Sequence, residues 1–432
     1  MIPVERHRER ILAAVSRGEP QRVPVNAAHG CVLAADVVAA VPLPGFDNSA
    51  MDGYVVAAAD VAALPEPGGS GCGCAGGTQH EGHEGHTPPV RLPVRGDIAA
   101  GDTRRLRLEP GEAYRIMTGA PMPAGADVVV PVELTDGGLD VVTLTCADAP
   151  GRHVRREGED VRAGDVVLRA GVFVGARQLA LIAACGAVDV LVYPRPKVVC
   201  LSTGDELVAP GTVPGFGQVV DSNGLMLAAA LREAGFDAVS GGVVRDTEDD
   251  VLTALGEHLR TADAIVTTGG VSMGAYDAVK AALSRLGTVQ FDKVAMQPGK
   301  PQGFGTIGER DVPVFTLPGN PVSALVSAHV FVVPALRAMA GWQRAEPEPV
   351  RARVLDGWTS PPERAQFVRV LLDREAGEPV VRSAGGQGSH VLQALADANA
   401  LAYVPAEVTR VEPGQVLDVT PFGASEAAGW GP

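Results

Sequence analysis

The sequence lacks the features that would place it at a membrane or on a nucleic acid. No apolar run reaches the roughly 18 residues that a membrane span requires. Residues 1–17 are charged and amphipathic and have no signal-peptide core. The net charge of the 432-residue chain is −15 at pH 7, which argues against general nucleic-acid binding. We therefore expect a cytosolic protein with neither a membrane nor a nucleic acid as partner.

Lysine is scarce. Of 36 basic residues only four are lysines, and all lie between positions 197 and 300: Lys197, Lys280, Lys293 and Lys300. One interpretation is an arginine-biased composition with a few lysines left by chance. The other is a site that needs a compact ammonium group rather than a planar guanidinium. Lys300, in the stretch QPGKPQGFG, is the candidate for such a site.

Cysteine is also infrequent, with six in the chain. Four of them lie in apolar surroundings: Cys31, Cys146, Cys185 and Cys200. We expect these four to be small buried side chains and not disulfides.

The other two cysteines belong to a low-complexity stretch, PEPGGSGCGCAGGTQHEGHEGHTPP, at residues 65–89. We expect a flexible insert at 67–87. It carries the possible Zn²⁺ or Ni²⁺ ligands Cys72, Cys74, His80, His83 and His86. The alternative is a solvated loop with adventitious metal affinity.

The remaining composition indicates a folded, multidomain chain. Apolar residues make up 46% and charged residues 20%, which excludes a disordered protein, and 53 glycines with 34 prolines indicate many turns. Since single cores stop growing near roughly 250–300 residues, several domains are expected. We predict a discontinuous helical linker domain at 1–25 and 150–190, a β-rich domain at 26–149, an α/β domain at 191–343 and a C-terminal β-barrel at 344–425.

The α/β domain has the clearest pattern. The strand-like runs KVVCLS, DAVSGGVV and ADAIVTT alternate with helical segments, which predicts a doubly wound parallel sheet. Asp221, Ser222 or Asn223 is expected to cap the first helix, with Gly235 ending it. Asp246 or Thr247 is expected to cap the second.

Acidic residues and Thr-Gly turns follow the ends of these strands, where ligands bind in such sheets. The carboxylate candidates for Mg²⁺ are Glu206, Asp246 and Asp277. The candidates for binding the phosphate or pterin are Thr203, Gly204, Asp205, Gly269, Gly270 and Ser272. Two alternatives stay open, since Asp246 could serve only as a helix cap and Asp205 could serve only to close a turn.

Seven stretches then occur in a recognisable order: PGFDNSAMDGYVV, IMTGAPMPAGADVVVPVE, REGEDVRAGD, STGDELVAPG, TTGGVSMGAYD, PGKPQGFG and LPGNPVSALV. Over nearly the whole chain they resemble the molybdopterin molybdotransferase family, which includes bacterial MoeA and the gephyrin E domain. The resemblance implies four-domain subunits in a homodimer whose cleft is shared between subunits. It also implies an enzyme that inserts molybdate into adenylylated molybdopterin with Mg²⁺ and releases AMP, with possible transient contact with the adenylyltransferase of the preceding step.

The resemblance also implies residue roles. The cleft positions match Asp52, Thr118, Asp160, Glu206, Asp246 and Asp277. The molybdate positions match Lys300, Pro301, Ser323, Arg364 and Ser389. Two features depart from the pattern: Gln297 stands where many members have a second lysine, and the insert at 67–87 is not shared.

Three alternatives to this function stay open. The adenylyltransferase of the preceding step shares the sheet domain but needs only about 150–190 residues, so the flanking domains argue against it. The second alternative is that this protein is a catalytically weak paralogue that acts as a scaffold or cofactor-binding protein. The third is that it is a homologue that prefers tungstate to molybdate.

Overall fold

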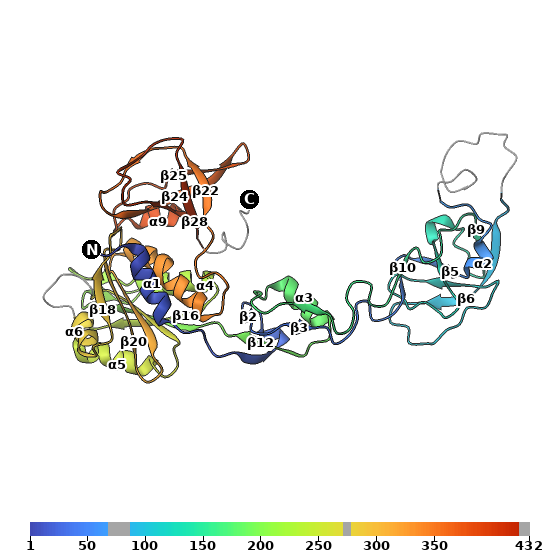
Figure 1. Ribbon diagram of the computed structural model, residues 1–432, viewed down its shortest axis with the longest axis horizontal. Helices are drawn as coiled ribbons and strands as arrows, with labels where there is room; N and C mark the ends of the chain where they lie inside the picture. The colour runs from blue at the N-terminus through green and yellow to red at the C-terminus, as the bar shows by residue number, and fades with distance from the viewer. Residues whose placement is uncertain (68–86, 271–277, 423–432) are drawn as a thin grey trace. The chain divides into compact units, whose positions relative to one another are not determined.

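The computed structural model describes residues 1–67, 87–270 and 278–422 of the chain (Figure 1). Contacts divide the chain into two compact units. Unit 1 comprises residues 1–35, 170–175 and 191–432, and unit 2 comprises residues 36–169 and 176–190. Each unit has its own sheets and its own core, and the four-domain division stays a prediction.

The main sheet of unit 1 has the strand order β16-β13-β17-β21-β20-β18. Four strands are parallel: β13 (Lys197–Thr203), β16 (Asp237–Val244), β17 (Ala264–Thr268) and β21 (Val312–Leu317). Strand β20 (Pro301–Ile307) pairs antiparallel with β21, and the edge strand β18 (Gln290–Lys293) pairs antiparallel with β20. The predicted doubly wound sheet is confirmed, with an antiparallel edge that the sequence analysis did not include.

Burial on both faces explains why the parallel strands have continuous apolar sequences. All five residues of β17 are buried, and so are the last six of β13. Strands covered on both faces read as continuous apolar runs, as these do. The covering helices are α4 (Asn223–Glu233), α5 (Glu248–His258), α6 (Ala278–Arg285), α1 (Val4–Ala14), α7 (Pro321–Ser327) and α8 (Val333–Met339).

Helices α7 and α8 are joined by a π-helical turn at Ala328–Val332. The continuous segment Pro321–Met339 is long and apolar enough, by composition alone, to cross a membrane, and within the described residues it is the one helix that meets this test. Most of it, 89% of the apolar window, lies buried in the protein. Packing in the core therefore accounts for its apolar character.

The C-terminal part of unit 1 forms the predicted barrel. Its closed circuit consists of β24 (Ala365–Glu375), β25 (Glu378–Ser383), β22 (Val350–Val354), β28 (Val416–Pro421) and β26 (Ala400–Val404). A short strand, β19 (Met296–Gln297), leaves the sheet domain and pairs in parallel with the beginning of β24. Helix α9 (Leu392–Asp397) packs against β24.

Unit 2 is β-rich. Its sheet has the order β8-β5-β7-β6-β9. These strands are β8 (Val128–Pro131), β5 (Gly53–Val56), β7 (Ala113–Ile116), β6 (Val90–Ile98) and β9 (Val141–Leu144). The smaller elements are α2 (Ala58–Val61), α3 (Ala176–Ala184), and the strand pairs β4 (Asn48–Ser49) with β10 (Val154–Arg155) and β3 (Val37–Val38) with β11 (Val166–Leu168).

The short strands β1 (Gln21–Pro24), β2 (Val32–Leu33) and β12 (Asp189–Tyr193) form a small sheet. Strand β14 (Leu207–Val208) pairs with β15 (Val219–Val220), and β23 (Trp358–Thr359) pairs with β27 (Arg410–Val411). The four apolar cysteines are buried, as expected: Cys31, Cys146, Cys185 and Cys200. Burial raises the pKa of Cys200 to about 12, so this thiol stays protonated.

Candidate functional site

The carboxyl ends of β13, β17 and β21 approach one another very closely. The hydroxyl of Thr203 donates to the carbonyl of Thr268 at 3.3 Å. The N–H of Gly269 donates to the carbonyl of Leu317 at 3.2 Å. Three candidate residues, Thr203, Gly204 and Gly269, are therefore held at one edge of the sheet.

Two adjacent positions in the loop after β17 require glycine. Gly269 and Gly270 have φ angles of +96° and +64°. A Cβ on Gly269 would come within 2.4 Å of the Thr203 carbonyl oxygen, and one on Gly270 within 2.5 Å of a Val279 methyl. The loop thus combines left-handed backbone with close packing, the conditions under which main-chain atoms can approach a ligand.

The described acidic candidates of the α/β domain, Asp205, Glu206 and Asp246, lie at the same edge. The N–H of Asp246 donates to the Asp205 carboxylate at 3.1 Å, so Asp205 ties the loop after β13 to the loop after β16. The exposed Glu206 folds back over Gly204, where a Cβ would meet its carboxylate at 2.5 Å. Asp205 therefore has a bridging role, while Glu206 and Asp246 present carboxylates beside it.

The two open questions about helix caps are resolved. Thr247 is the N-cap of α5, since its hydroxyl accepts the N–H of Asp250 at 3.2 Å. Asp246 is therefore not the helix cap. At α4, the Asp221 carboxylate accepts from the N–H of Gly224 at 3.1 Å and from the hydroxyl of Ser202 at 2.8 Å. Gly235 follows the end of α4 with a φ of +95°, as predicted.

Asn223 is a residue of this edge that the sequence analysis considered only as a cap. Its side-chain nitrogen donates to the Thr268 hydroxyl at 3.0 Å and to the Gly319 carbonyl at 2.7 Å. Its buried side-chain oxygen has no partner in the described part of the chain. Asn223 thereby fixes the spacing of the loops after β17 and β21.

The same edge carries few potential metal ligands among the described residues. Among the described residues, no group of three or more His, Cys, Asp or Glu side chains converges closely enough to hold a metal ion. Asp277 and Ser272 lie outside the described residues, as do Cys72, Cys74, His80, His83 and His86 of the insert. Glu206 and Asp246 are two hard oxygen donors, which fits Mg²⁺, since that ion usually takes one or two carboxylates, substrate phosphates and waters.

A second cluster surrounds the loop at 297–301. Strand β19 pairs Gln297 with Gln366 on β24, and the N–H of Ala365 donates to the Ala295 carbonyl at 2.9 Å. The half-buried Arg364 immediately precedes this contact. Lys300 is exposed, and its ammonium has no partner within the described residues.

Helix α7 forms another side of this cluster. The side chain of Gln302 donates to the Gly299 carbonyl and to the Ser327 hydroxyl, each at 2.6 Å. Ser323, one turn earlier on the same helix, is only 5% exposed. Pro301 begins β20 directly after Lys300.

Ser389 is held at the start of the same helix. The Asn320 amide donates to the Ser389 hydroxyl at 3.0 Å, and the N–H of Val322 donates to its carbonyl at 3.3 Å. The predicted oxyanion residues of the α/β domain and of the barrel are thus brought to one seam.

Arg369 is a residue that the sequence analysis missed. Its side chain is 1% exposed. The guanidinium donates to the carbonyls of Gly386, Gly388 and Val391 at 2.6, 3.2 and 2.9 Å. Burial lowers its pKa below the usual arginine value. Arg369 therefore shapes the loop that carries Ser389 and places a cation behind it, and the only sequence signal was an arginine within an apolar strand.

The other predicted carboxylates belong to unit 2. The Asp52 carboxylate accepts the N–H of Thr118 at 2.6 Å and its hydroxyl at 2.8 Å. These two bonds, the backbone bond first, hold the pKa of Asp52 below its ordinary value. Both side chains are exposed, so Asp52 presents an ionised carboxylate at the surface of unit 2.

Asp47, also missed from sequence, organises the loops around Asp52 and Asp160. Its carboxylate accepts the N–H of Glu157 at 2.8 Å and the Arg156 guanidinium at 2.6 Å. These bonds lower the pKa of Asp47, the Glu157 bond contributing most. Asp160 is exposed, and its N–H donates to the Leu43 carbonyl at 3.1 Å.

Three successive stretches of the chain match families of molybdenum-cofactor proteins. Residues 2–186 match the MoeA N-terminal region (domain I and II), residues 199–338 a probable molybdopterin binding domain, and residues 351–422 the MoeA C-terminal region (domain IV).

Individual proteins match over similar lengths. Molybdopterin molybdenumtransferase 2 of Mycobacterium tuberculosis is 45% identical, over 97% of this chain and 99% of its own. Molybdopterin molybdenumtransferase of Nostoc sp. is 35% identical, over 93% and 88% respectively. The solved structure of a molybdopterin biosynthesis MoeA protein from Pyrococcus horikoshii is 30% identical with a TM-score of 0.73, over 98% and 99% of the two chains.

The predicted fold class is therefore confirmed, and this chain belongs to the molybdopterin molybdenumtransferase (MoeA) family.

Proposed function

We propose that this protein is a molybdopterin molybdotransferase, which inserts molybdate into adenylylated molybdopterin and releases AMP, forming molybdenum cofactor. Curated relatives named molybdopterin molybdenumtransferase, which match over nearly the full length, support the activity. The observation that carries the proposal is the seam at β19. There the Lys300 loop and the Ser389 loop are each hydrogen-bonded to α7 or to its N-cap residue, and α7 carries the buried Ser323. Strand β19, just before Lys300, also pairs with the beginning of β24.

Charge is the main physical problem in this reaction, because molybdate is a dianion and the adenylylated pterin carries an anionic pyrophosphate. The exposed ammonium of Lys300 neutralises the oxyanion, and the hydroxyls of Ser323 and Ser389 donate to it. Arg364 adds a guanidinium at the start of β24. Arg369 keeps the Ser389 loop in place and adds buried positive charge behind it.

The sheet edge is proposed to bind the phosphate-bearing substrate. The phosphate would lie against main-chain atoms of Gly269 and Gly270 and the hydroxyl of Thr203. Asn223 sets the spacing of the loops that carry these groups. Mg²⁺, when bound, neutralises pyrophosphate charge, and Glu206 and Asp246 would hold it, with Asp277 as the third proposed ligand. Ser272 is proposed as a further phosphate donor.

Asp52, Thr118 and Asp160 complete the proposed set. Thr118 keeps Asp52 ionised, which suits a carboxylate that orients a cation or a donor group. We infer that the active form is a cytoplasmic homodimer in which these residues serve a cleft shared between subunits, and that the adenylyltransferase of the preceding step makes transient contact with it.

The test is AMP release from adenylylated molybdopterin, measured with the full chain at increasing molybdate and, separately, tungstate. Release that depends on molybdate and Mg²⁺ is the expected result. A stronger response to tungstate would indicate a tungstate-preferring homologue. Binding of pterin without oxyanion-dependent release would indicate a scaffold or cofactor-binding paralogue instead.

A further inference from the structure

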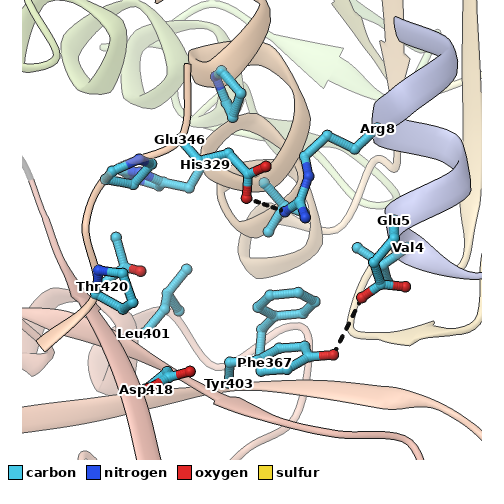
Figure 2. Close-up of a pocket in the computed structure, with 14 residues that line it drawn as sticks. Val4, Glu5, Arg8, His329, Glu346, Phe367, Leu401, Tyr403, Asp418 and Thr420 are labelled. Carbon is cyan, nitrogen blue, oxygen red and sulfur yellow. Dashed lines mark hydrogen bonds and ion pairs between the residues drawn. The ribbon is translucent and has the colours of Figure 1, made fainter. Parts of the chain in front are cut away.

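A cavity of about 240 Å³ lies in unit 1 away from the residues discussed above. Figure 2 shows that α1 contributes Glu5 and Arg8, the helical segment Pro321–Met339 contributes His329, and the barrel contributes Phe367, Leu401, Tyr403 and Asp418. None of the lining residues belongs to the proposed reaction site. The cavity therefore needs an explanation of its own.

One side of the cavity is an aromatic and aliphatic surface. The rings of Phe367 and Tyr403 pack with centroids 5.5 Å apart at an interplanar angle of 50°. Leu401 continues this surface on β26, the strand that also carries Tyr403, and Val330 of the segment Pro321–Met339 lines the cavity as well. Such a surface, with a few polar groups at its rim, is the usual form of a small-molecule site.

The charged groups around this surface are predominantly acidic. Three carboxylates line the cavity, those of Glu5, Glu346 and Asp418, against the single guanidinium of Arg8. Arg8 is already paired with Glu346 at 2.9 Å, as Figure 2 shows. Asp418 also pairs with Arg351, on the exposed side of the barrel, at 3.2 Å.

The remaining titratable groups add no positive charge at neutral pH. Burial, with a smaller effect of Arg337, lowers the pKa of His329 to about 4, so its ring is neutral. Burial and the neighbouring Glu5 raise the pKa of Tyr403 to about 12, so its hydroxyl stays protonated and donates to Glu5 at 3.3 Å. Even with Arg351 counted, three carboxylates face two guanidinium groups, so one negative charge remains in excess. A negative charge beside aromatic rings is the combination that attracts an ammonium group.

We propose that this cavity binds an organic cation, namely an ammonium group carried on an aromatic or branched apolar body. The ammonium lies toward Glu5 and Asp418, and the apolar body lies on Phe367 and Leu401. The proposal does not depend on the proposed reaction, since no lining residue is shared with that site.

The test is calorimetric titration of the full chain with three probes of similar size: 2-phenylethylammonium, 2-phenylethanol and 3-phenylpropionate. The ammonium probe is expected to bind with one site per chain and roughly tenfold more tightly than the neutral alcohol, from charge-assisted and cation–π contacts. The carboxylate probe is expected to bind least. Equal binding of the three probes, preference for the carboxylate, or no binding of the ammonium probe would each overturn the proposal.

Variants locate the binding. Glu5→Gln keeps an acceptor for the Tyr403 hydroxyl but removes the charge. It is expected to weaken binding of the ammonium probe about fivefold. Glu9→Gln, on the same helix but outside the cavity lining, is the matched control and is expected to leave binding unchanged. Phe367→Leu keeps an apolar side chain without the ring, and it should weaken binding of the ammonium probe more than binding of the alcohol. Binding that neither Glu5→Gln nor Phe367→Leu alters would place the probe elsewhere and refute the assignment.

Discussion

The candidate carboxylates occupy two regions that are built in different ways. At the sheet edge of unit 1, main-chain packing sets the geometry, since Gly269 and Gly270 leave no room for a Cβ. In unit 2, side-chain hydrogen bonds set it, since the exposed Asp52 is held by Thr118. The first region should therefore be sensitive to added volume and the second to protonation. Substitutions in the two regions can test that contrast.

Gly269→Ala should have the largest effect. The added methyl would lie 2.4 Å from the Thr203 carbonyl oxygen, in a backbone conformation at φ +96° that alanine disfavours. We expect the free energy of unfolding to fall by about 3 kcal/mol, measured by denaturant titration. Gly211→Ala is the matched control, because Gly211 has a φ of +89° with nothing within 4 Å of its Cβ position. It should lose only about 1 kcal/mol. Equal losses would mean that backbone strain, and not close packing, demands glycine at the edge.

Lys300→Ala should raise the molybdate concentration needed for AMP release by about ten- to a hundredfold, while adenylylated pterin still binds. A charge-assisted contact is worth roughly 1.5–3 kcal/mol, which corresponds to that factor. Lys300→Arg should rescue only partly, because a planar fork does not reproduce a compact ammonium. Gln297→Lys should lower the requirement.

The exposed Lys293, on β18, provides the control as Lys293→Ala, which should leave the molybdate requirement unchanged. If Lys300→Ala abolished pterin binding and left the molybdate dependence unaltered, this lysine would belong to the other substrate.

Glu206→Gln should keep the fold, because the side chain is exposed on a loop. We expect the Mg²⁺ concentration for half-maximal AMP release to rise by about tenfold, since a neutral amide is a much weaker ligand for a hard cation. Asp249→Asn, exposed in the first turn of α5, is the control. Normal turnover of Glu206→Gln at limiting Mg²⁺ would remove this carboxylate from the metal site.

Thr118→Val should have the smallest effect, on protonation alone. The pKa of Asp52 is lower in the folded state than in the unfolded state. Its ionised carboxylate therefore stabilises the folded state fully above the unfolded pKa of about 3.9, and this stabilisation is lost as the pH falls through the folded-state pKa. The variant removes the hydroxyl bond but keeps the N–H bond, so the pKa of Asp52 should rise toward its ordinary value. Carbon-detected NMR titration of the carboxylate measures this, with Thr135→Val as a control elsewhere in unit 2. No change in Thr118→Val would show that the N–H bond alone sets the pKa.

Patterns local in sequence predicted local structure well. The alternation of apolar strands with capped helices gave the sheet, and Thr247 proved to be the cap beside Asp246. The antiparallel edge was missed although a signal existed. Only residues 308–311 separate β20 from β21, which is too short for a parallel crossover and typical of a hairpin.

Long-range roles could not be predicted in the same way. Asn223 acts through Gly319, 96 residues away, and Arg369 acts through carbonyls about 20 residues further along the chain. Nothing in the neighbouring residues encodes such partners, because the fold alone brings them together. The residues Lys300, Ser323 and Ser389 were indicated by family resemblance, and their contacts could be described only from the structure.

The pairing of β19 with β24 also has a consequence for how the protein is made. The oxyanion seam needs the Lys300 loop, the strand that begins at Ala365 and the Ser389 loop together. A chain emerging from the ribosome folds its amino-terminal parts first. The sheet domain can thus be complete while the seam still lacks two of its parts. A nascent or carboxyl-terminally truncated chain should therefore form the proposed phosphate-binding edge before the proposed molybdate-binding residues come together. If the assignment proposed above holds, such a chain binds molybdate only after the barrel has closed.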